Sequence, residues 1–570
     1  MGGEGRGGRD GGEVKDHRPS SLPCRSRLSR PYQTLCALCA SAATFLTVLL
    51  LIVPRGIAEQ DPHAAHAMPP LPRELIERPL PLRPGIGAAH DAVSTREPQA
   101  QEYYDQGLAY LHSFMWIEAA RSFHQALRLD SMLAMADVGL SYAYVELNAP
   151  AEAKASLDRA RSRAASASEH DRCHVELRAA QMAAEAAPRD TALLTTYRNT
   201  LDAALAKWPD DVELLVSRGL AESPDAAERG QGSLPGSVRF FERAVNLAPK
   251  QFAAHHFLTH AFENAGRTSD ALVQGEMYAR MAPQVPHARH MFGHELRRSG
   301  KIAEAIAEFE AADRLEVEYL EREHVPAAHD WHYHHNLDLL ATSYQYVGRM
   351  TKAEELFRKS FAMPSNSLEQ EFNKREWPVF LRGRGRAADA LTAAMEMTAH
   401  PSPLISAAGH IEAGEAHLAL KQPREAVDDA NAALRLMRSS PEGAGLLEPA
   451  LQQLRGELLL RRGQRDQGRE TLQQVARNVR AAPGPDAWAQ ALFTLEAIAR
   501  AARESGYWDV AEWAAQQMLE HDPNYAGTHY ALGLVARHNS NHAAARAEFD
   551  RARALWAHAD SGLPELQDLK

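Results

Sequence analysis

Histidine is the residue type whose number and position point to chemistry in this sequence. The chain has 27 histidines among 570 residues, and many of them fall between residues 255 and 335. That group comprises His255, His256, His260, His287, His290, His294, His324, His329, His332, His334 and His335. Neutral imidazole binds zinc, copper, iron or nickel, and its unperturbed pKa lies near neutral pH. The segment is therefore a candidate for a metal site or for acid–base chemistry.

The spacing of these histidines is regular. His256 and His260 are four residues apart, which places both on one face of a helix. His290 and His294 repeat that spacing 34 residues later, and His287 extends their stripe by about one turn. Two neighbouring helices that pack side by side would bring these nitrogen ligands together.

The same register continues past an insertion of about 14 residues. When the insertion is allowed for, His335 corresponds to His287, and Asp338 corresponds to His290. We predict a transition-metal site for copper, iron or zinc, whose ligands come from His256, His260, His287, His290, His294, His335 and Asp338. Seven ligands exceed what one tetrahedral ion needs, and they suffice for two ions or for one ion with supporting histidines.

Elements with a period of 34 residues must position these side chains. A pattern of small and bulky residues recurs at this interval, with Gly107, Tyr110, Ala119, Phe123 and Ala126 followed by Ser141, Tyr144, Ala153, Leu157 and Ala160. Another copy contains Gly293, Leu296, Ala305, Phe309 and Ala312. Small residues let two antiparallel helices approach closely, and the bulky ones fill the space between repeats.

This pattern resembles the tetratricopeptide repeat (TPR) family, whose signature has small residues at positions 8, 20 and 27 of each unit. The resemblance covers about ten or eleven units over residues 99–557. It implies an all-α fold, an α-α superhelical solenoid of helical hairpins with a concave groove. In the family, positions 2, 5 and 9 of the first helix line that groove, and the predicted ligands occupy these positions here. The resemblance therefore implies a histidine site in the groove.

Three functions follow as hypotheses. The first is an interaction scaffold that binds a protein or peptide and carries the metal site in its groove. The second is a metalloenzyme of the copper or iron oxidoreductase type. The third is a metal-free peptide-binding solenoid, in which protonated histidines hold an acidic peptide at low pH. A zinc-protease motif is absent, because His294-Glu295 is followed by Leu296-Arg297-Arg298.

The insertion before residue 334 contains acidic residues, histidines and Trp331. Long connections inside compact arrays are often functional. We leave three interpretations open, namely a lid over the histidines, a source of further ligands, and a solvated acidic connector.

The N-terminal region has the pattern of an export signal. Residues 35–53 form an uncharged hydrophobic helix that serves as a signal anchor or signal peptide, and Arg25, Arg27 and Arg30 precede it. We expect a membrane contact through this segment only, with the body extracytoplasmic, or periplasmic in a bacterium. Cleavage after Ala58 and retention as an anchor both remain open.

Composition adds a limit on partners and a division of the chain. Formal charge is −11, and no basic stripe interleaved with aromatics is present, so no nucleic-acid partner is expected. The predicted segments are a disordered N-terminus (1–34), the hydrophobic helix (35–53), a Pro-rich linker (54–98), N-terminal TPR units (99–160), irregular helical repeats with a loop (161–251), His-rich TPR units with the insertion (252–364), C-terminal TPR units (365–557) and a tail (558–570).

Overall fold

The computed structural model describes residues 71–569, apart from 228–229, 231–233, 366, 441–443 and 483–486. The predicted hydrophobic helix at 35–53 lies outside the described residues. Among the described helices, none has both the length and the apolar character to cross a membrane.

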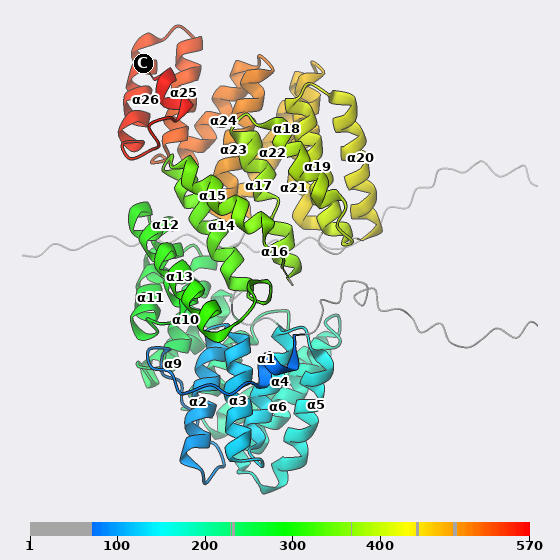
Figure 1. Ribbon diagram of the computed structural model, residues 1–570, viewed down its shortest axis with the longest axis vertical. Coiled ribbons are helices and arrows are strands. Elements are labelled where there is room, and N and C mark those ends of the chain that lie inside the picture. Colours follow the sequence, from blue (N-terminus) through cyan, green and yellow to red (C-terminus); the bar gives the residue numbers. More distant parts are fainter. Residues whose placement is uncertain are drawn as a thin grey trace, which may run out of the picture. The chain divides into compact units, whose positions relative to one another are not determined.

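Within this part of the chain the secondary structure is helical, and the only β-type pairing is a single bridge between Ala88 and Gln251. Successive helices pair as hairpins along the chain (Figure 1). The hairpins are α2 (Pro98–His112) with α3 (Trp116–Leu129), α4 (Ala134–Glu146) with α5 (Pro150–Arg163), α6 (Glu169–Glu185) with α7 (Thr191–Lys207), α8 (Val212–Leu220) with α9 (Val238–Leu247), α10 (Phe252–Asn264) with α11 (Thr268–Met281), α12 (Pro286–Arg298) with α13 (Ile302–Glu323), α14 (Trp331–Tyr346) with α15 (Met350–Ala362), α17 (Glu376–Gly383) with α18 (Ala387–Thr398), α19 (Pro403–Ala419) with α20 (Pro423–Ser439), α21 (Ala444–Arg461) with α22 (Arg465–Ala481), α23 (Ala487–Glu504) with α24 (Trp508–His521), and α25 (Ala526–His538) with α26 (His542–Leu555).

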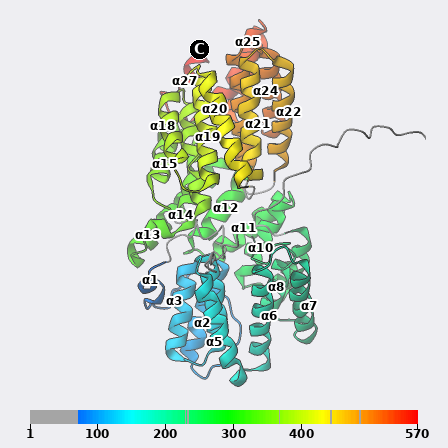
Figure 2. The same ribbon diagram turned by 90° about the vertical axis from the view of Figure 1, so that its right-hand side faces the viewer.

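Short helices complete the description. These are α1 (Arg73–Glu77), α16 (Leu368–Asn373) and α27 (Pro564–Asp568), together with 3-10 turns η2 (Ala164–Ser166), η3 (Pro235–Ser237) and η4 (Ala327–His329). Neighbouring hairpins also pack on each other. Helix α24 lies against α22, which itself pairs with α21 (Figure 2).

Close contact between a glycine and a phenylalanine explains the hairpin geometry. A methyl group added at Gly107 would lie 2.5 Å from the ring of Phe123, and one added at Gly293 would lie 2.8 Å from the ring of Phe309. Both rings are fully buried. Only a residue without a side chain lets the two helices approach this closely around the ring. The expected all-α array of TPR-type hairpins is confirmed.

Residues 71–97, which we call the strap, lie on the body instead of forming part of a free linker over 54–98. Leu75, Ile76 and Leu80 are buried, and the backbone carbonyl of Gly85 accepts a hydrogen bond from the Gln284 amide. The many prolines favour an extended backbone. Burial of the strap's apolar side chains away from water still stabilises the folded state. The linker prediction was therefore wrong for the strap.

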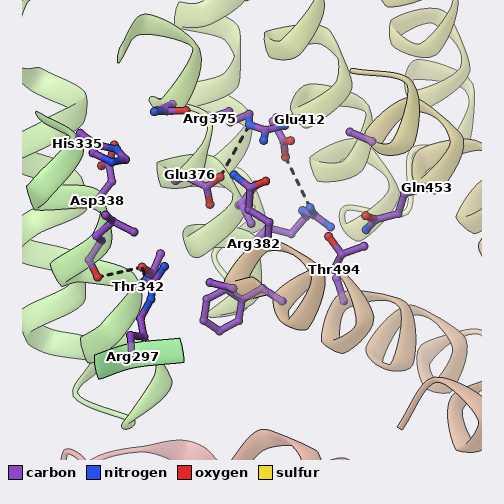
Figure 3. Close-up of a pocket in the computed structure, with 18 residues that line it drawn as sticks. Arg297, His335, Asp338, Thr342, Arg375, Glu376, Arg382, Glu412, Gln453 and Thr494 are labelled. Carbon is purple, nitrogen blue, oxygen red and sulfur yellow. Dashed lines mark hydrogen bonds and ion pairs between the residues drawn. The ribbon is translucent and has the colours of Figure 1, made fainter. Parts of the chain in front are cut away.

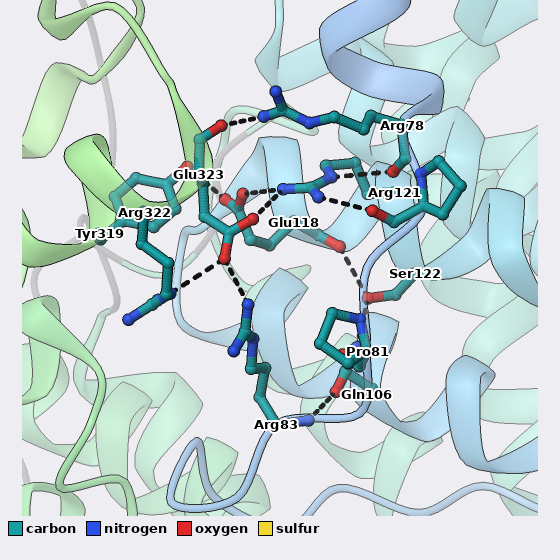
Figure 4. Close-up of polar contacts among 11 residues, drawn as sticks. Arg78, Pro81, Arg83, Gln106, Glu118, Arg121, Ser122, Tyr319, Arg322 and Glu323 are labelled. Atoms are coloured by element: carbon teal, nitrogen blue, oxygen red, sulfur yellow. Dashed lines mark hydrogen bonds and ion pairs between the residues drawn. The ribbon is translucent and has the colours of Figure 1, made fainter.

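Charged contacts also fasten the strap (Figure 4). The carboxylate of Glu323, at the end of α13, accepts hydrogen bonds from Arg83 at 2.6 Å and from Arg121 at 2.8 Å. Arg121 also donates to the strap carbonyls of Arg78 and Pro79. Arg121 is almost fully buried, so this network satisfies a charge that would otherwise be costly.

The insertion lengthens α13 and then turns into α14. Helix α13 ends at Glu323, and the next residue, His324, has left-handed backbone (φ 49°). The Asp330 side chain caps α14 by accepting from the amides of His332 and Tyr333. Glu316 and Glu323 are buried, whereas Glu318 and Glu321 are exposed. The interpretation as a solvated acidic connector therefore holds for only part of the insertion.

Candidate metal centre

Three first helices of neighbouring hairpins bring the predicted histidines together. His256 and His260 lie on α10, His287, His290 and His294 lie on α12, and His335 lies on α14. All six are buried, with exposed fractions between 0 and 9%. The shared register predicted from the sequence thus places them in one interior region.

Their ring nitrogens form two groups of three. In the first, the Nε2 atom of His256 lies 3.1 Å from Nε2 of both His260 and His287. In the second, Nε2 of His290 and Nε2 of His294 are 3.0 Å apart, and His335 offers the third nitrogen. Within each group the ligand atoms lie within 4.8 Å of one another. Ligands at about 2.0–2.1 Å from a tetrahedral ion are separated by about 3.3 Å, which is close to the distances of 3.0–3.1 Å found in both groups.

Hydrogen bonds at the Nδ1 atoms of two rings determine the direction in which their Nε2 atoms point. His256 Nδ1 lies 2.7 Å from the His112 carbonyl oxygen, which can only accept a hydrogen bond. His290 Nδ1 lies 3.0 Å from Asn336 Oδ1, and the Asn336 amide nitrogen donates to the Phe309 carbonyl. Both rings therefore carry their proton on Nδ1 and direct an Nε2 lone pair inward, which is the usual arrangement of metal-binding histidines.

His332 joins the two groups and was not among the predicted ligands. Its ring lies 5.0 Å from the ring of His287 and 4.7 Å from that of His290. Its Nδ1 lies 2.9 Å from Glu316 Oε2, and its buried Nε2 has no hydrogen-bond partner. The spacing of three residues between His332 and His335, which matches His287 and His290, was the signal in the sequence.

Asp338 does not join either group. It lines a pocket of about 120 Å³ with His335, Arg297 and Arg382 (Figure 3). Helix α14 presents residues 332 and 335 to the cluster instead of 335 and 338, a shift of about one helical turn. The ligand assignment of Asp338 is therefore not supported by the geometry.

Aromatic side chains close the site, so it is an interior site and not part of an open groove. Phe114, in the α2–α3 turn, lies with its ring 4.7 Å from that of His256 and 5.0 Å from that of His287. Trp331 lies 6.0 Å from His335. The resemblance placed these histidines in a groove, but they are buried here, and helix α2 packs against α10 beside them.

Burial keeps the cluster uncharged. It lowers the pKa of His260 to about 3 and that of His332 to about 4. Burial, followed by the neighbouring histidines, holds the pKa of His287 and His290 well below the ordinary value. Neutral imidazole is the form that binds metal ions. Protonated histidines that hold an acidic peptide are not compatible with this environment.

Two pockets lead from the strap toward the cluster. The outer one, of about 420 Å³, lies between the strap and α13 and includes Arg83 and Glu323. The inner one, of about 30 Å³, includes His287 and His332. Both are lined by Met115, Glu118, Pro286 and Tyr319, which therefore separate them. Tyr319 donates a hydrogen bond to Glu118 at this point.

Together, the hairpins define the chain as a helical-repeat protein of the TPR type. No protein-family model and no curated protein sequence matches it. Similar solved structures include the APC/C hetero-tetramer Cut9–Hcn1, at 15% identity over 83% of this chain and 96% of that chain, with a TM-score of 0.27. A tetratricopeptide repeat protein from Parabacteroides merdae matches at 16% identity over 49% of this chain and 99% of that chain, with a TM-score of 0.33. Human IFIT1 with m7Gppp-AAAA matches at 12% identity over 82% and 92%, with a TM-score of 0.34.

Proposed function

We propose that this TPR-type scaffold carries two transition-metal ions, one in each histidine group. The convergence of the six nitrogens is the observation that supports the proposal. His256, His260 and His287 would hold one ion, and His290, His294 and His335 would hold the other, with His332 between them. The outer hydrogen bonds of His256 and His290 already orient these two rings for that role.

Copper fits the ligand set best. The two groups offer imidazole nitrogen alone, with neither thiolate nor carboxylate in them. Imidazole suits copper, iron, nickel and zinc, and copper binds most tightly among the divalent ions of this series. Iron and zinc are the competing occupants.

Elemental analysis of the purified full chain tests the proposal. In separate reconstitutions, we expect about two equivalents of copper per chain and fewer equivalents of iron or zinc. Less than about 0.1 equivalent of every transition metal, before and after reconstitution, would overturn the proposal. Two sites that each offer three neutral imidazoles would bind such ions tightly.

A second candidate function is an oxidoreductase, in which the bound ions would supply one-electron chemistry. The observation that favours it is that two pockets border the cluster. The pocket in Figure 3 includes His335, and the inner pocket between the α2–α3 turn and α14 includes His287 and His332. Oxygen uptake by the copper-loaded chain in the presence of ascorbate, with the metal-free chain as control, tests this function. Equal uptake by both samples would exclude it for that donor.

Partner binding and location complete the proposal. Repeat arrays of this type generally offer extended surfaces to proteins or peptides. We further propose that the body is exported behind residues 35–53, which would expose it to an oxidising compartment. Fractionation of cells that express the full chain tests this location, and recovery of the body only in the cytoplasm would contradict it.

A further inference from the structure

A third group of metal-ligating side chains lies away from the histidine cluster. It consists of Asp91 on the strap, His170 and His174 on α6, and Asp211 at the start of α8. Each offers one ligand atom, and these four atoms lie within 4.8 Å of one another. His170 and His174 are four residues apart on one helix face, and their Nε2 atoms are 3.3 Å apart.

Local hydrogen bonds position the Asp211 carboxylate and the backbone at Asp91. Asp211 caps α8 by accepting the Leu214 amide with one carboxylate oxygen, and its other oxygen lies 2.5 Å from His170 Nε2. The strap backbone is held beside α2, because Gln101 donates to the Asp91 carbonyl and accepts from the Val93 amide. Asp211 is therefore fixed by its own hydrogen bonds, and the backbone that carries Asp91 is fixed on α2.

Negative charge gathers around these ligands. Burial, followed by Glu213 and Asp211, raises the pKa of Asp91 to about 8. Two further carboxylates already have hydrogen-bond partners, since Asp171 accepts from Ser94 and Glu213 lies beside His112. Asp91 and Asp211 face the histidine pair, where a divalent cation would stabilise the ionised form of both carboxylates.

We propose that Asp91, His170, His174 and Asp211 form a separate zinc site that fastens the strap to α6 and α8. Two imidazoles and two carboxylates make a four-coordinate set that zinc accepts. The mixed donor set distinguishes this site from the two all-histidine groups. A pocket of about 80 Å³ reaches Asp91 and His174, so the ion has a place to enter.

The site predicts a mechanical consequence. Its ligands are separated by 120 residues of sequence, from Asp91 to Asp211, so zinc would join the strap to two helices that follow it in the chain. Binding to the folded state alone stabilises that state by mass action. Arg96 follows Asp91 on the strap and is exposed, so trypsin cleavage after Arg96 can report on whether the strap is held in place.

The test uses the full chain, stripped with a chelator and then dialysed against zinc ions. We expect Asp91→Asn and His174→Gln each to hold about one equivalent of zinc less than the unchanged chain. Asp91→Asn keeps the size of the side chain, and the unfolding curve of this variant without zinc shows any effect of the substitution on the fold itself. The matched control is His90→Gln, because His90 is exposed and pairs with Asp105 at 2.7 Å outside the site.

Trypsin cleavage after Arg96 provides the second measurement. Zinc should slow cleavage at least about tenfold in the unchanged chain and in His90→Gln, but not in Asp91→Asn. Equal zinc content in all variants would overturn the proposal and would leave a His170–Asp211 ion pair as the role of these residues. Substitutions at His260 and His294 remove the other ions, so a failure of the histidine cluster is seen separately from a failure here.

Discussion

The Nε2 atoms of His256 and His287 lie 3.1 Å apart, although the two residues belong to different repeats. His256 uses its ring proton for the His112 carbonyl, so its Nε2 lone pair can only accept. His260 Nε2 lies at the same distance from that lone pair. One lone pair forms one good hydrogen bond, whereas a metal ion binds all three nitrogens at once.

Substitution of one ligand in each group should remove one ion each. We expect His260→Ala and His294→Ala to lower the copper content by about one equivalent apiece, and the double variant to lose both copper ions of the cluster, because two histidines hold an ion far more weakly than three. The control is His255→Ala on the same helix, since His255 pairs with Gln274 and lies outside both groups. Full occupancy in the double variant would show that the ligands are others.

Removal of the hydrogen-bond acceptor for His290 should weaken binding without removing a ligand. Asn336→Leu should lower the affinity of the second group about 10–100-fold, since the His290 ring loses the partner that fixes its proton on Nδ1. Asn336→Asp keeps an acceptor oxygen and should retain most of the affinity. Competition titration with a chromophoric chelator measures both, and equal affinity in all three proteins would contradict this role of Asn336.

Acid should destabilise the metal-free chain. His260 and His332 have pKa values of about 3 and about 4 in the folded state, and both titrate near 6.5 when unfolded. The unfolded state therefore binds more protons between these values. The contribution of these two histidines to the free energy of unfolding is therefore complete above about pH 6.5, and it is lost as the pH decreases toward about 4. Urea unfolding at pH 7, 6 and 5 measures the trend, and a constant free energy over this range would contradict it.

Added volume at Gly293 should affect both the fold and the site. Gly293→Ala places a methyl group against Phe309, whose ring lies 5.5 Å from that of His290. We expect a loss of about 1–3 kcal/mol of stability and weaker metal binding by the second group. Gly533→Ala makes the same clash with Phe549 in a distant repeat, so it should lower stability and leave metal content unchanged. Thermal unfolding and elemental analysis separate the two effects.

Loss of the Glu323 carboxylate should loosen the strap. Glu323→Ala leaves the buried guanidinium of Arg121 without its closest carboxylate, which costs about 3–5 kcal/mol for a buried pair. Glu77→Ala breaks a pair with the exposed Arg73 and should cost less than about 1 kcal/mol. Chemical unfolding followed by tryptophan fluorescence compares them. Similar values for the two variants would show that the Glu323 network adds little.

Part of the site could be predicted from local patterns in the sequence. The spacing of four residues between His256 and His260, repeated at His290 and His294, depends on helix geometry and on the 34-residue period alone. The structure confirms that these side chains share one interior region. His332 was missed because the insertion shifts α14 by about one turn, and no period in the sequence encodes that shift.

The sequence by itself determined the helices, their pairing and the face on which each histidine lies, since these follow from residue spacing within one or two repeats. Tertiary structure alone decided that Phe114 covers the cluster and that the strap brings Asp91 to His170. It also decided that Asp338 stays outside. These outcomes depend on packing between residues that are far apart in the chain, where the loss of water and the fit of side chains decide which contacts form.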